Sequence, residues 1–368
     1  MDEKHLWIGF NLVKGIGPVR IQTLLDHFGS LTHAWNAQPS SLQDAGLNQK
    51  VIENFLDIRQ KVDLSTYVDS LIGKGIRVMT WLDADYPIRL KNIPQPPPVL
   101  YILGQYTPED QWAVAIVGTR RVTSYGRQVT EQTAAYLARQ GITVISGLAR
   151  GVDGIAHFAA LNNGGRTIAV LGSGVDEIYP PEHRQLAEKI AINGAVISDY
   201  SPGTAPDSSN FPPRNRIISG LSAAVVVIEA GETSGALITA TFAAEQGRDV
   251  FAVPGGIYSP QSKGTNRLIQ QGASPLLDPK DILDLLDIHH VEHYKQASLL
   301  LPADDVESAL LKLLQLEPLQ IDELKAQSGL AVEKISAGLT MLELKGLVRQ
   351  VNGSAYQAVM EDQAEYHS

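Results

Sequence analysis

The chain has 368 residues, of which 44% are hydrophobic, and it contains no cysteine. This length exceeds that of one average domain, so two or three globular domains are expected. No run of about eighteen apolar residues is present, which excludes a membrane-spanning helix, and the lack of cysteine excludes disulfides and thiolate metal sites. The acidic start MDEKHLWIGF has no signal-peptide core, so we expect a cytoplasmic protein without a membrane partner. The formal net charge of −10 argues against a polyanionic partner, unless the basic residues are clustered.

Residues 1–60 have the pattern of short helices. The segment 10–30 has a G-x-G-P turn followed by an amphipathic helix, which resembles a helix-hairpin-helix motif, and a weaker copy lies at 42–58. The turn amides of such a motif can hold a DNA phosphate. A packing module of the same shape that does not touch DNA is equally compatible, because only Lys14 and Arg20 flank the turn.

Residues 75–110 are expected to connect this module to the next domain. GIRVMTW (75–81) is a predicted strand, and the prolines at the start of IPQPPPVLYILG (93–104) exclude a helix there.

The middle of the chain alternates short β-branched runs with predicted helices, which indicates repeated βα units and a parallel sheet. In this architecture the loops after the strands emerge at one edge of the sheet, where ligands bind. These loops are rich in glycine, serine and arginine. The six runs are 113–117, 142–145, 167–170, 195–198, 223–228 and 249–252, and the loops that follow them are 118–126, 146–154, 171–181, 199–220, 229–235 and 253–266.

The composition of these loops predicts a ligand that carries phosphate. Glycines allow backbone N–H groups to approach an anion, and helix N-termini add partial positive charge. Phe211 and Tyr125 are the candidates for base stacking. A local basic cleft on an acidic protein is expected from the residues in or beside the loops: Arg120, Arg121, Arg127, Arg150, Arg214, Arg216, Lys263 and Arg267.

Two common phosphate-binding motifs are absent from the sequence. The first loop, GTRRVTSYG, is not G-x-G-x-x-G, the second strand is followed by Ser146 and not by an acid, and there is no P-loop. A dinucleotide or ATP cofactor is therefore not expected. The nine histidines have no H-E-x-x-H spacing, so no metal site is expected. Several anion-binding loops side by side fit the successive phosphates of a polynucleotide better.

The C-terminal segment follows a different pattern. Predicted helices at 306–315, 321–330 and 332–347 precede a hairpin at 348–359 with an Asn-Gly turn, which together describe a winged-helix domain. Its third helix carries as many glutamates as lysines, so protein contact is the favoured use over DNA reading.

The loop motifs resemble the DNA-processing protein family DprA, also called Smf. The resemblance runs from residue 86 to residue 283 and rests on GTRRVTSYG, SGLARGVDGIAH, LGSGVDEIYPPEH, FPPRNRIISGLS, EAGETSGALITA and VPGGIYSPQSKGTNRLIQQGA. It implies an α/β fold: an extended Rossmann-like core with an N-terminal helical (helix-hairpin-helix or SAM-like) module and a C-terminal winged helix. The expected domains are 1–74, 75–290 and 303–368, with a linker at 291–302.

The resemblance also implies a function without catalysis. Members of this family bind single-stranded DNA as homodimers and pass it to the RecA recombinase in the presence of single-strand-binding protein, which protects transforming DNA. The helix at 264–273 is the candidate dimer interface. Carried over position by position, the DNA-binding residues would be Gly118, Thr119, Arg120, Ser124, Gly126, Ser146, Gly147, Gly172, Ser173, Phe211, Arg214, Asn215, Arg216, Lys263, Gly264 and Thr265.

Structural roles are the alternatives at several of these positions. Arg120 could form an ion pair with Glu229, and the Phe211 ring could be a hydrophobic residue packed beneath its loop. Arg214 and Arg216 are two residues apart at a helix start, so they point in different directions and one of them could be structural. Asp153 and His157 share a helix face, where a cap and a core histidine are favoured over acid–base chemistry.

The runner-up function is enzymatic. Cytokinin-activating phosphoribohydrolases share a P-G-G loop, here PGGI (254–257), followed by G-T-x-x-E with a catalytic acid. This chain has GTNRL (264–268) instead, without that acid. A transcriptional regulator that uses the winged helix is a third reading, and the weakly basic third helix counts against it.

Overall fold

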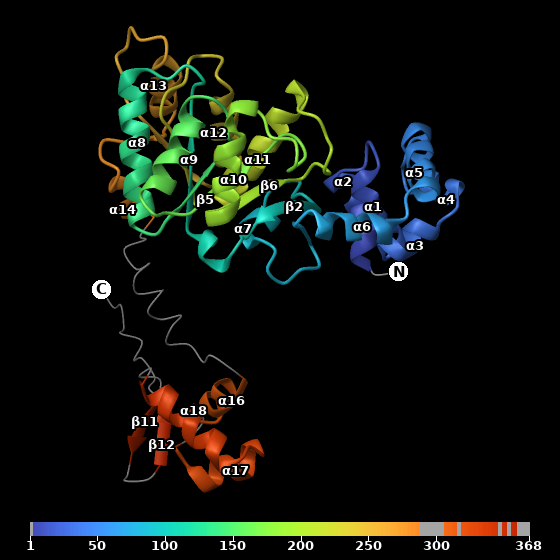
Figure 1. The fold of residues 1–368 in the computed structure, drawn as a ribbon, viewed down its shortest axis with the longest axis vertical. Coiled ribbons are helices and arrows are strands. Elements are labelled where there is room, and N and C mark those ends of the chain that lie inside the picture. The colour runs from blue at the N-terminus through green and yellow to red at the C-terminus, as the bar shows by residue number, and fades with distance from the viewer. Residues whose placement is uncertain (1–2, 287–304, 315–317, 345–347, 352–354, 359–368) are drawn as a thin grey trace. The chain divides into compact units, whose positions relative to one another are not determined.

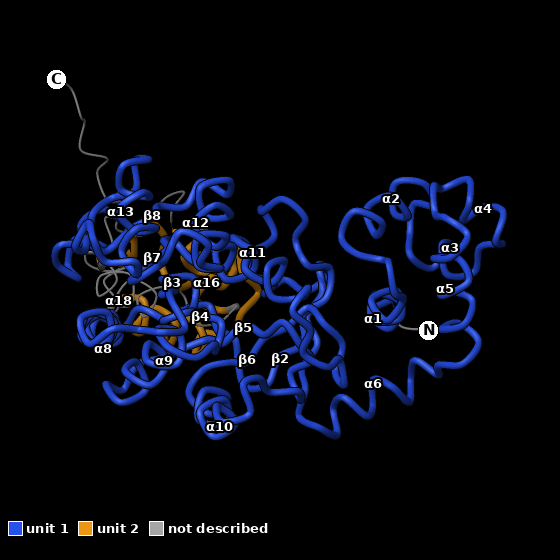
Figure 2. Tube along the Cα trace, turned by 90° about the horizontal axis from the view of Figure 1, so that it is seen from above, with its two compact units in different colours: residues 1–286 blue, residues 287–368 orange. Residues whose placement is uncertain are grey.

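The computed structural model describes residues 3–286, 305–314, 318–344, 348–351 and 355–358. It forms two compact units, residues 1–286 and 287–368 (Figure 2). The boundary predicted at residue 74 lies within the first unit, and the linker predicted at 291–302 lies outside the described residues.

Helices form the N-terminal part of the first unit, and their apolar faces meet in an aromatic core. Phe10 stacks on Phe55 with ring centroids 5.3 Å apart, and Trp35 lies edge-on to each of them at 5.2 Å. This core continues to the sheet through Val78 and Tyr101. The helices are α1 (Glu3–Leu12), α2 (Pro18–Phe28), α3 (Leu31–Asn36), α4 (Pro39–Asp44), α5 (Gln49–Lys61) and α6 (Leu64–Gly73).

The hairpin predicted at 10–30 is the turn between α1 and α2. The Asn54 side chain of α5 donates a hydrogen bond of 2.9 Å to the carbonyl of Lys14, which fixes the turn to α5. Contact of this turn with a DNA phosphate stays a prediction.

A nine-stranded sheet forms the centre of the first unit in the described residues, in the order β1-β2-β6-β5-β4-β3-β7-β8-β9. The predicted parallel core is confirmed: the seven strands β6-β5-β4-β3-β7-β8-β9 are parallel to one another, whereas β2 is antiparallel to β6 and β1 is antiparallel to β2. The strands are β1 (Ile76–Thr80), β2 (Val99–Gly104), β3 (Ala113–Val117), β4 (Thr143–Ser146), β5 (Thr167–Val170), β6 (Gly194–Ser198), β7 (Ala224–Val227), β8 (Asp249–Ala252) and β9 (Ser274–Pro275).

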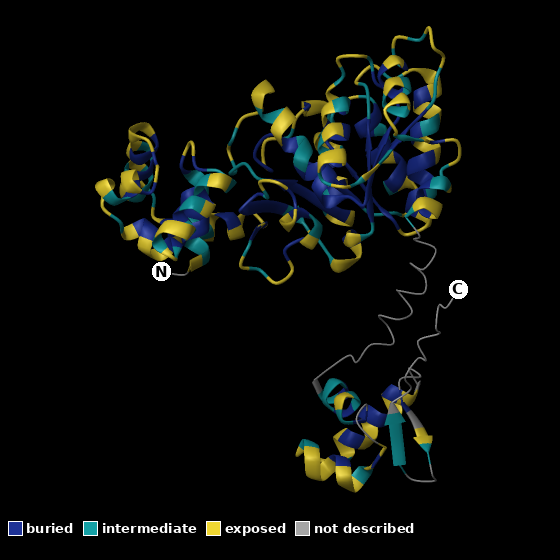
Figure 3. Cartoon of the chain, turned by 180° about the vertical axis from the view of Figure 1, so that it is seen from behind, coloured by how far each residue is buried: buried dark blue, intermediate teal, exposed yellow. Residues whose placement is uncertain are grey.

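Helices cover both faces of this sheet (Figures 1 and 2). The apolar β-branched strands are buried between the two helical layers, as Figure 3 shows in dark blue. Each helix starts from a loop at the carboxyl edge of the strands, so several helix N-termini point to the same edge. One layer contains α8 (Ser124–Arg139), α9 (Val152–Asn162) and α10 (Arg184–Asn193), and the other contains α11 (Phe211–Leu221) and α12 (Gly235–Glu245).

Shorter elements complete the first unit. They are α7 (Ile88–Lys91), α13 (Lys263–Gln270), α14 (Asp281–Leu285) and the 3₁₀ turns η1 (Pro108–Gln111), η2 (Pro181–His183) and η3 (Ser208–Asn210).

The second unit has the helices and the hairpin strands predicted for a winged helix. Its core contains Leu310, Leu324, Ile335 and Leu339. The turn predicted at Asn352 and Gly353 lies outside the described residues. The sequence analysis did not identify the two-residue strand β10. The elements are α16 (Asp305–Leu314), β10 (Leu319–Gln320), α17 (Ile321–Ser328), α18 (Val332–Leu344), β11 (Val348–Val351) and β12 (Ala355–Ala358), and the strands form an antiparallel sheet in the order β10-β12-β11.

None of the helices in the described ranges is both long and apolar enough to cross a bilayer. Those ranges also contain no group of three or more histidine, aspartate or glutamate side chains arranged to hold a metal ion.

His157 of α9 is a core residue that should make the fold acid-sensitive. It is fully buried, and its Nδ1 lies 2.7 Å from Oγ1 of Thr167. Burial, together with the electrostatic influence of the neighbouring His183 and Arg214 side chains, lowers its pKa from 6.5 to about 3. Between these values the unfolded chain binds a proton that the folded chain does not, so stability falls as the pH drops below 6.5.

We therefore expect the free energy of unfolding in urea to decrease from about pH 6.5 downward, by up to about 1.4 kcal/mol per pH unit from this group. His157→Gln should flatten that slope. An unchanged slope in the variant would assign the acid sensitivity to other groups.

Candidate nucleic-acid interface

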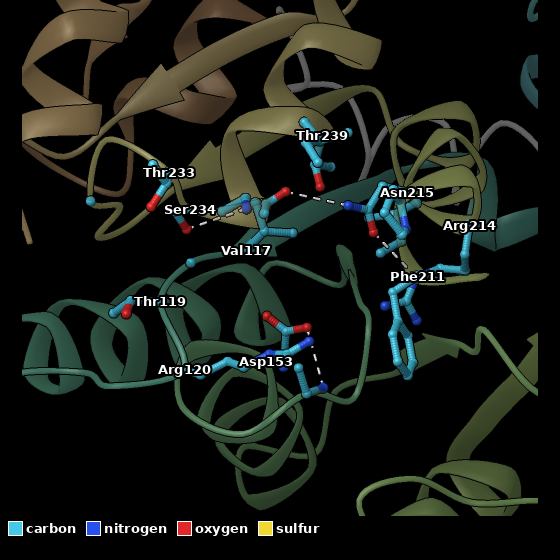
Figure 4. Close-up of a pocket in the computed structure, with 18 of the residues that line it drawn as sticks. Val117, Thr119, Arg120, Asp153, Phe211, Arg214, Asn215, Thr233, Ser234 and Thr239 are labelled. Atoms are coloured by element: carbon cyan, nitrogen blue, oxygen red, sulfur yellow. Dashed lines mark hydrogen bonds between the residues drawn. The ribbon is translucent and has the colours of Figure 1, made fainter. Parts of the chain in front are cut away.

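A pocket of about 700 Å³ opens at the carboxyl edge of the parallel strands. Every one of the six loops contributes to its wall, so their predicted convergence is confirmed. In Figure 4, Arg120 and Asp153 approach the pocket from one side, and Thr233, Ser234 and Thr239 from the opposite side. The six loops, taken in chain order, each contribute at least one residue to the wall, for example Arg120, Asp153, Tyr179, Phe211, Ser234 and Gln261.

Three helices begin at this pocket. Residues in the first turns of α9, α11 and α12 line it, and Ser234 caps α12 by accepting a hydrogen bond of 3.3 Å from the Ala236 amide. The N-terminal ends of helices carry partial positive charge and unpaired amide donors, although Pro212 and Pro213 in the first turn of α11 have no N–H and contribute only to the dipole. The pocket therefore favours an anionic ligand, independently of its arginines.

Six of the predicted site residues line the pocket, and Gly147 lines a small adjoining cavity with Arg120 and Arg214. The six are Gly118, Thr119, Arg120, Phe211, Arg214 and Asn215. They come from two segments that meet at the pocket, the loop after β3 and the start of α11.

Arg120 is exposed, and its guanidinium carbon lies 5.9 Å from the ring centroid of Phe211. The alternative pairing with Glu229 is not the arrangement observed. The carboxylate of Glu229 instead accepts hydrogen bonds from the Thr123 amide (2.9 Å) and hydroxyl (2.5 Å). Arg120 thus lies at the mouth of the pocket, where its fork of donors can meet a phosphate.

Arg214 is buried, with 5% of its surface exposed. Its Nη1 donates hydrogen bonds to the carbonyls of Gly147 (3.0 Å) and Val170. Burial lowers its pKa to about 10, against the opposing effect of the nearby Asp153 carboxylate, so the side chain is still a cation at neutral pH. A Cβ atom at Gly147 would lie 2.6 Å from Nη2 of Arg214, so only glycine leaves room for the guanidinium.

Arg216 faces away from the pocket and pairs with Asp199. Its Nη2 lies 2.9 Å from Oδ2 of Asp199, and both side chains are largely buried. The two arginines do point in different directions, as their spacing predicts. Between them, Asn215 accepts a hydrogen bond of 3.3 Å from Nε of Arg214 and donates one of 3.3 Å to the carbonyl of Gly235.

Two aromatic rings form one wall of the pocket, which we call the aromatic wall: Tyr179 and Phe211. Their ring centroids are 5.8 Å apart with planes tilted by 34°. A Cβ atom at Gly172 would lie 2.8 Å from Cδ1 of Phe211, so this glycine makes room for the ring. Our sequence analysis did not single out Tyr179, although it is the aromatic residue of its loop. Tyr125, which it did consider, donates a hydrogen bond of 3.0 Å to the carbonyl of Pro254 and does not line the pocket.

The remaining predicted site residues lie outside the pocket wall, and their part in binding stays a prediction. Several support the loops. The hydroxyl of Ser146 donates to the Ile116 carbonyl (2.6 Å), and that of Ser173 donates to the Glu177 carbonyl (2.7 Å). Ser124 is the first residue of α8, whose N-cap is Thr123.

Three glycine and threonine positions are tightly packed. A Cβ atom at Gly126 would meet the Glu229 carboxylate, and the Gly264 amide donates a hydrogen bond of 2.8 Å to the Ala230 carbonyl. The Thr265 hydroxyl donates to the Ser262 carbonyl (3.1 Å).

The basic residues predicted for the cleft divide into two groups. Arg120, Arg121 and Arg214 line the pocket, and Arg150 lines the adjoining cavity while pairing with Glu182 at 2.5 Å. The others have carboxylate neighbours or lie further away. Arg127 is 3.7 Å from Glu131, Lys263 is 3.7 Å from Glu232, and Arg267 lies in the last turn of α13.

Asp153 is the carboxylate in the pocket wall. It accepts hydrogen bonds from the amides of Gly147 (3.1 Å) and Ala149 (3.3 Å), which organises the loop before α9. Burial raises its pKa, and Arg214 opposes that shift. The predicted capping role is wrong: the N-cap of α9 is Gly151, without a side-chain cap, and Asp153 instead supports the loop before the helix.

Comparisons with known proteins cover both units of the chain. Residues 77–287 match the family model described as DNA recombination-mediator protein A, and residues 295–354 match the DprA winged helix domain. Protein Smf of Synechocystis sp. is 39% identical over 97% of this chain and 99% of its own length. DNA processing protein DprA of Bacillus subtilis is 43% identical over 60% of this chain and 74% of its own length.

Solved structures of related proteins have the same fold. DprA from Streptococcus pneumoniae has a TM-score of 0.66 and 34% identity, covering 76% of this chain and 97% of its own. DprA from Helicobacter pylori, whose structure describes a single-stranded DNA binding mode, has a TM-score of 0.52 and 31% identity, covering 57% of this chain and 95% of its own. The matched regions include all six loops that form the pocket. This chain belongs to the DprA/Smf family.

Proposed function

We propose that this protein binds single-stranded DNA at the loop-edge pocket without catalysing a reaction. The observation that carries the proposal is the joint presence of Arg120, three helix N-termini and the aromatic wall around one opening. Arg120 and the helix N-termini can bind a phosphate, and the aromatic wall can stack on an unpaired base. The single-stranded DNA binding mode of the Helicobacter pylori relative supports the same assignment.

In this proposal, different groups of the protein bind the phosphate backbone of the DNA and one of its bases. Arg120 and the amides at the start of α12 hold phosphates, and a base enters the pocket against Phe211 and Tyr179. Stacking of a base on an aromatic side chain contributes about 1–3 kcal/mol and tolerates any base. Duplex DNA keeps its bases paired and stacked, so it would use only the phosphate contacts.

The geometry of the pocket carboxylate supports a binding role over hydrolysis. Asp153 is engaged by two loop amides, and Leu268, at the position of the catalytic acid in phosphoribohydrolases, packs against the apolar core. We therefore propose no catalytic residue, cofactor or metal.

The wider role that we propose follows from the family. The protein would act in the cytoplasm as a homodimer, with the helix at 264–273 at the interface. It would protect incoming single strands and load the RecA recombinase onto them past single-strand-binding protein. The names DNA recombination-mediator protein A and DNA processing protein support this role.

Binding should weaken steeply as salt is added. Each single-strand phosphate that the protein neutralises contributes about −0.7 to the slope of log K against log salt. Two or three neutralised phosphates therefore predict a slope of about −1.5 to −2. The slope is measured by anisotropy of a labelled oligo-dT across a salt series. A flat titration would mean that the backbone is not the main ligand.

A further inference from the structure

The aromatic wall is built from two loops that are distant in sequence. Tyr179 ends the loop after β5, and Phe211 follows the loop after β6. Their ring centroids are 5.8 Å apart only because these loops lie side by side. The position of the wall therefore depends on whatever holds one loop against the other.

The Asp176 carboxylate makes a side-chain hydrogen bond between the two loops. Its Oδ1 accepts a hydrogen bond of 2.7 Å from the Gly203 amide. Beside it, the Gly174 amide donates to the Thr204 carbonyl at 2.9 Å. A Cβ atom at Gly174 would lie 2.9 Å from both the Gly203 nitrogen and the Ser201 carbonyl oxygen, so the loops are closely packed here.

The second carboxylate oxygen of Asp176 faces the N-terminal helices. Lys74, at the end of α6, places Nζ 3.5 Å from Oδ2. The Asp176 side chain is 27% exposed, which is less than the 58% of Lys74. An exposed ion pair of this kind is worth little by itself. It leaves Oδ1 to accept the hydrogen bond from the Gly203 amide, because Lys74 approaches Oδ2.

We propose that Asp176 is a positioning residue for DNA binding: it clamps the loops after β5 and β6 together and so holds Tyr179 and Phe211 where an unpaired base can stack. This inference rests on the proposed function. Asp176 does not line the pocket, so its effect must pass through the aromatic wall.

The test compares two ligands of equal length: oligo-dT and a strand of abasic deoxyribose phosphates. In Asp176→Ala, affinity for oligo-dT should fall about fivefold, the effect of one hydrogen bond, while affinity for the abasic strand stays unchanged. Glu177→Ala is the matched control. It removes the same charge from the same loop, but the hydrogen bonds described for Glu177 use only its backbone. This control should bind both strands as the wild type does.

Two further variants show whether Asp176 acts as inferred. Asp176→Asn keeps an oxygen that can accept the Gly203 N–H, so it should restore most of the oligo-dT affinity. In a background that lacks both rings, Tyr179→Ala with Phe211→Ala, Asp176→Ala should cause no further loss, because the wall is already gone. Additive losses, or an equal loss for both strands, would overturn the inference. A wild-type protein that binds neither strand would instead overturn the proposed function.

Discussion

Replacing Arg120 by alanine is expected to weaken oligo-dT binding by about tenfold or more while leaving the thermal unfolding of the protein unchanged. The side chain is exposed at the pocket mouth and lies over Phe211, so its removal leaves no buried group without a partner. A hydrogen bond between charged groups contributes about 1.5–3 kcal/mol, which sets the expected loss. Fluorescence anisotropy gives the affinity, and circular dichroism gives the melting temperature.

The matched control for this experiment is Arg139→Ala. Arg139 is the last residue of α8, the helix that starts at the pocket edge and runs to the opposite end of the sheet, where Arg139 bonds Asn163 at 2.9 Å. The control removes the same charge at a distance from the pocket. If both variants weakened binding equally, the loss would reflect net charge and not a contact at Arg120.

Arg214→Ala is expected to lower the free energy of unfolding by about 3–5 kcal/mol, in addition to weakening oligo-dT binding about tenfold. From the sequence, both arginine variants are expected to bind less well and fold normally. The structure changes that expectation for Arg214, because its guanidinium is buried against the carbonyls of Gly147 and Val170 and beside Asp153. Its removal leaves two buried carbonyls without a donor and removes the positive charge that opposes the raised pKa of Asp153.

Urea unfolding of Arg214→Ala at neutral pH measures this effect, with Arg120→Ala as the comparison. The midpoint should shift far more in the Arg214 variant than in the Arg120 variant. An unchanged midpoint together with lost binding would mean that Arg214 acts mainly as a DNA ligand and not as a support for the loops.

The position of the site could be predicted from the sequence because it depends on topology. Alternating β-branched runs and helices indicate a parallel sheet, and a parallel sheet brings its post-strand loops to one edge. These two facts alone predict that the six loops meet at one site. The sequence also indicates the strands β1 and β2. Their position beside β6 depends on tertiary packing and could not be predicted from the sequence.

The role of each residue in the loops could not be predicted in the same way. Their spacing shows that the side chains of Arg214 and Arg216 point in different directions. It does not show that Arg216 pairs with Asp199 while Arg214 donates hydrogen bonds to backbone carbonyls. Likewise, the preference of Glu229 for Thr123 over Arg120 depends on the packing of Gly126 against that carboxylate. Tyr179 was missed because its neighbour, Phe211, is distant in sequence. Such contacts between loops leave no periodic signal.

The most direct test of the account is the affinity of the wild-type protein for labelled oligo-dT and for the same strand in a duplex, with AMP and NAD as competitors. The account predicts tight binding of the single strand, much weaker binding of the duplex, and no displacement by either nucleotide at concentrations equal to that of the oligonucleotide phosphates. Equal affinity for strand and duplex, or displacement by AMP, would contradict it and would favour a nucleotide pocket of the hydrolase type.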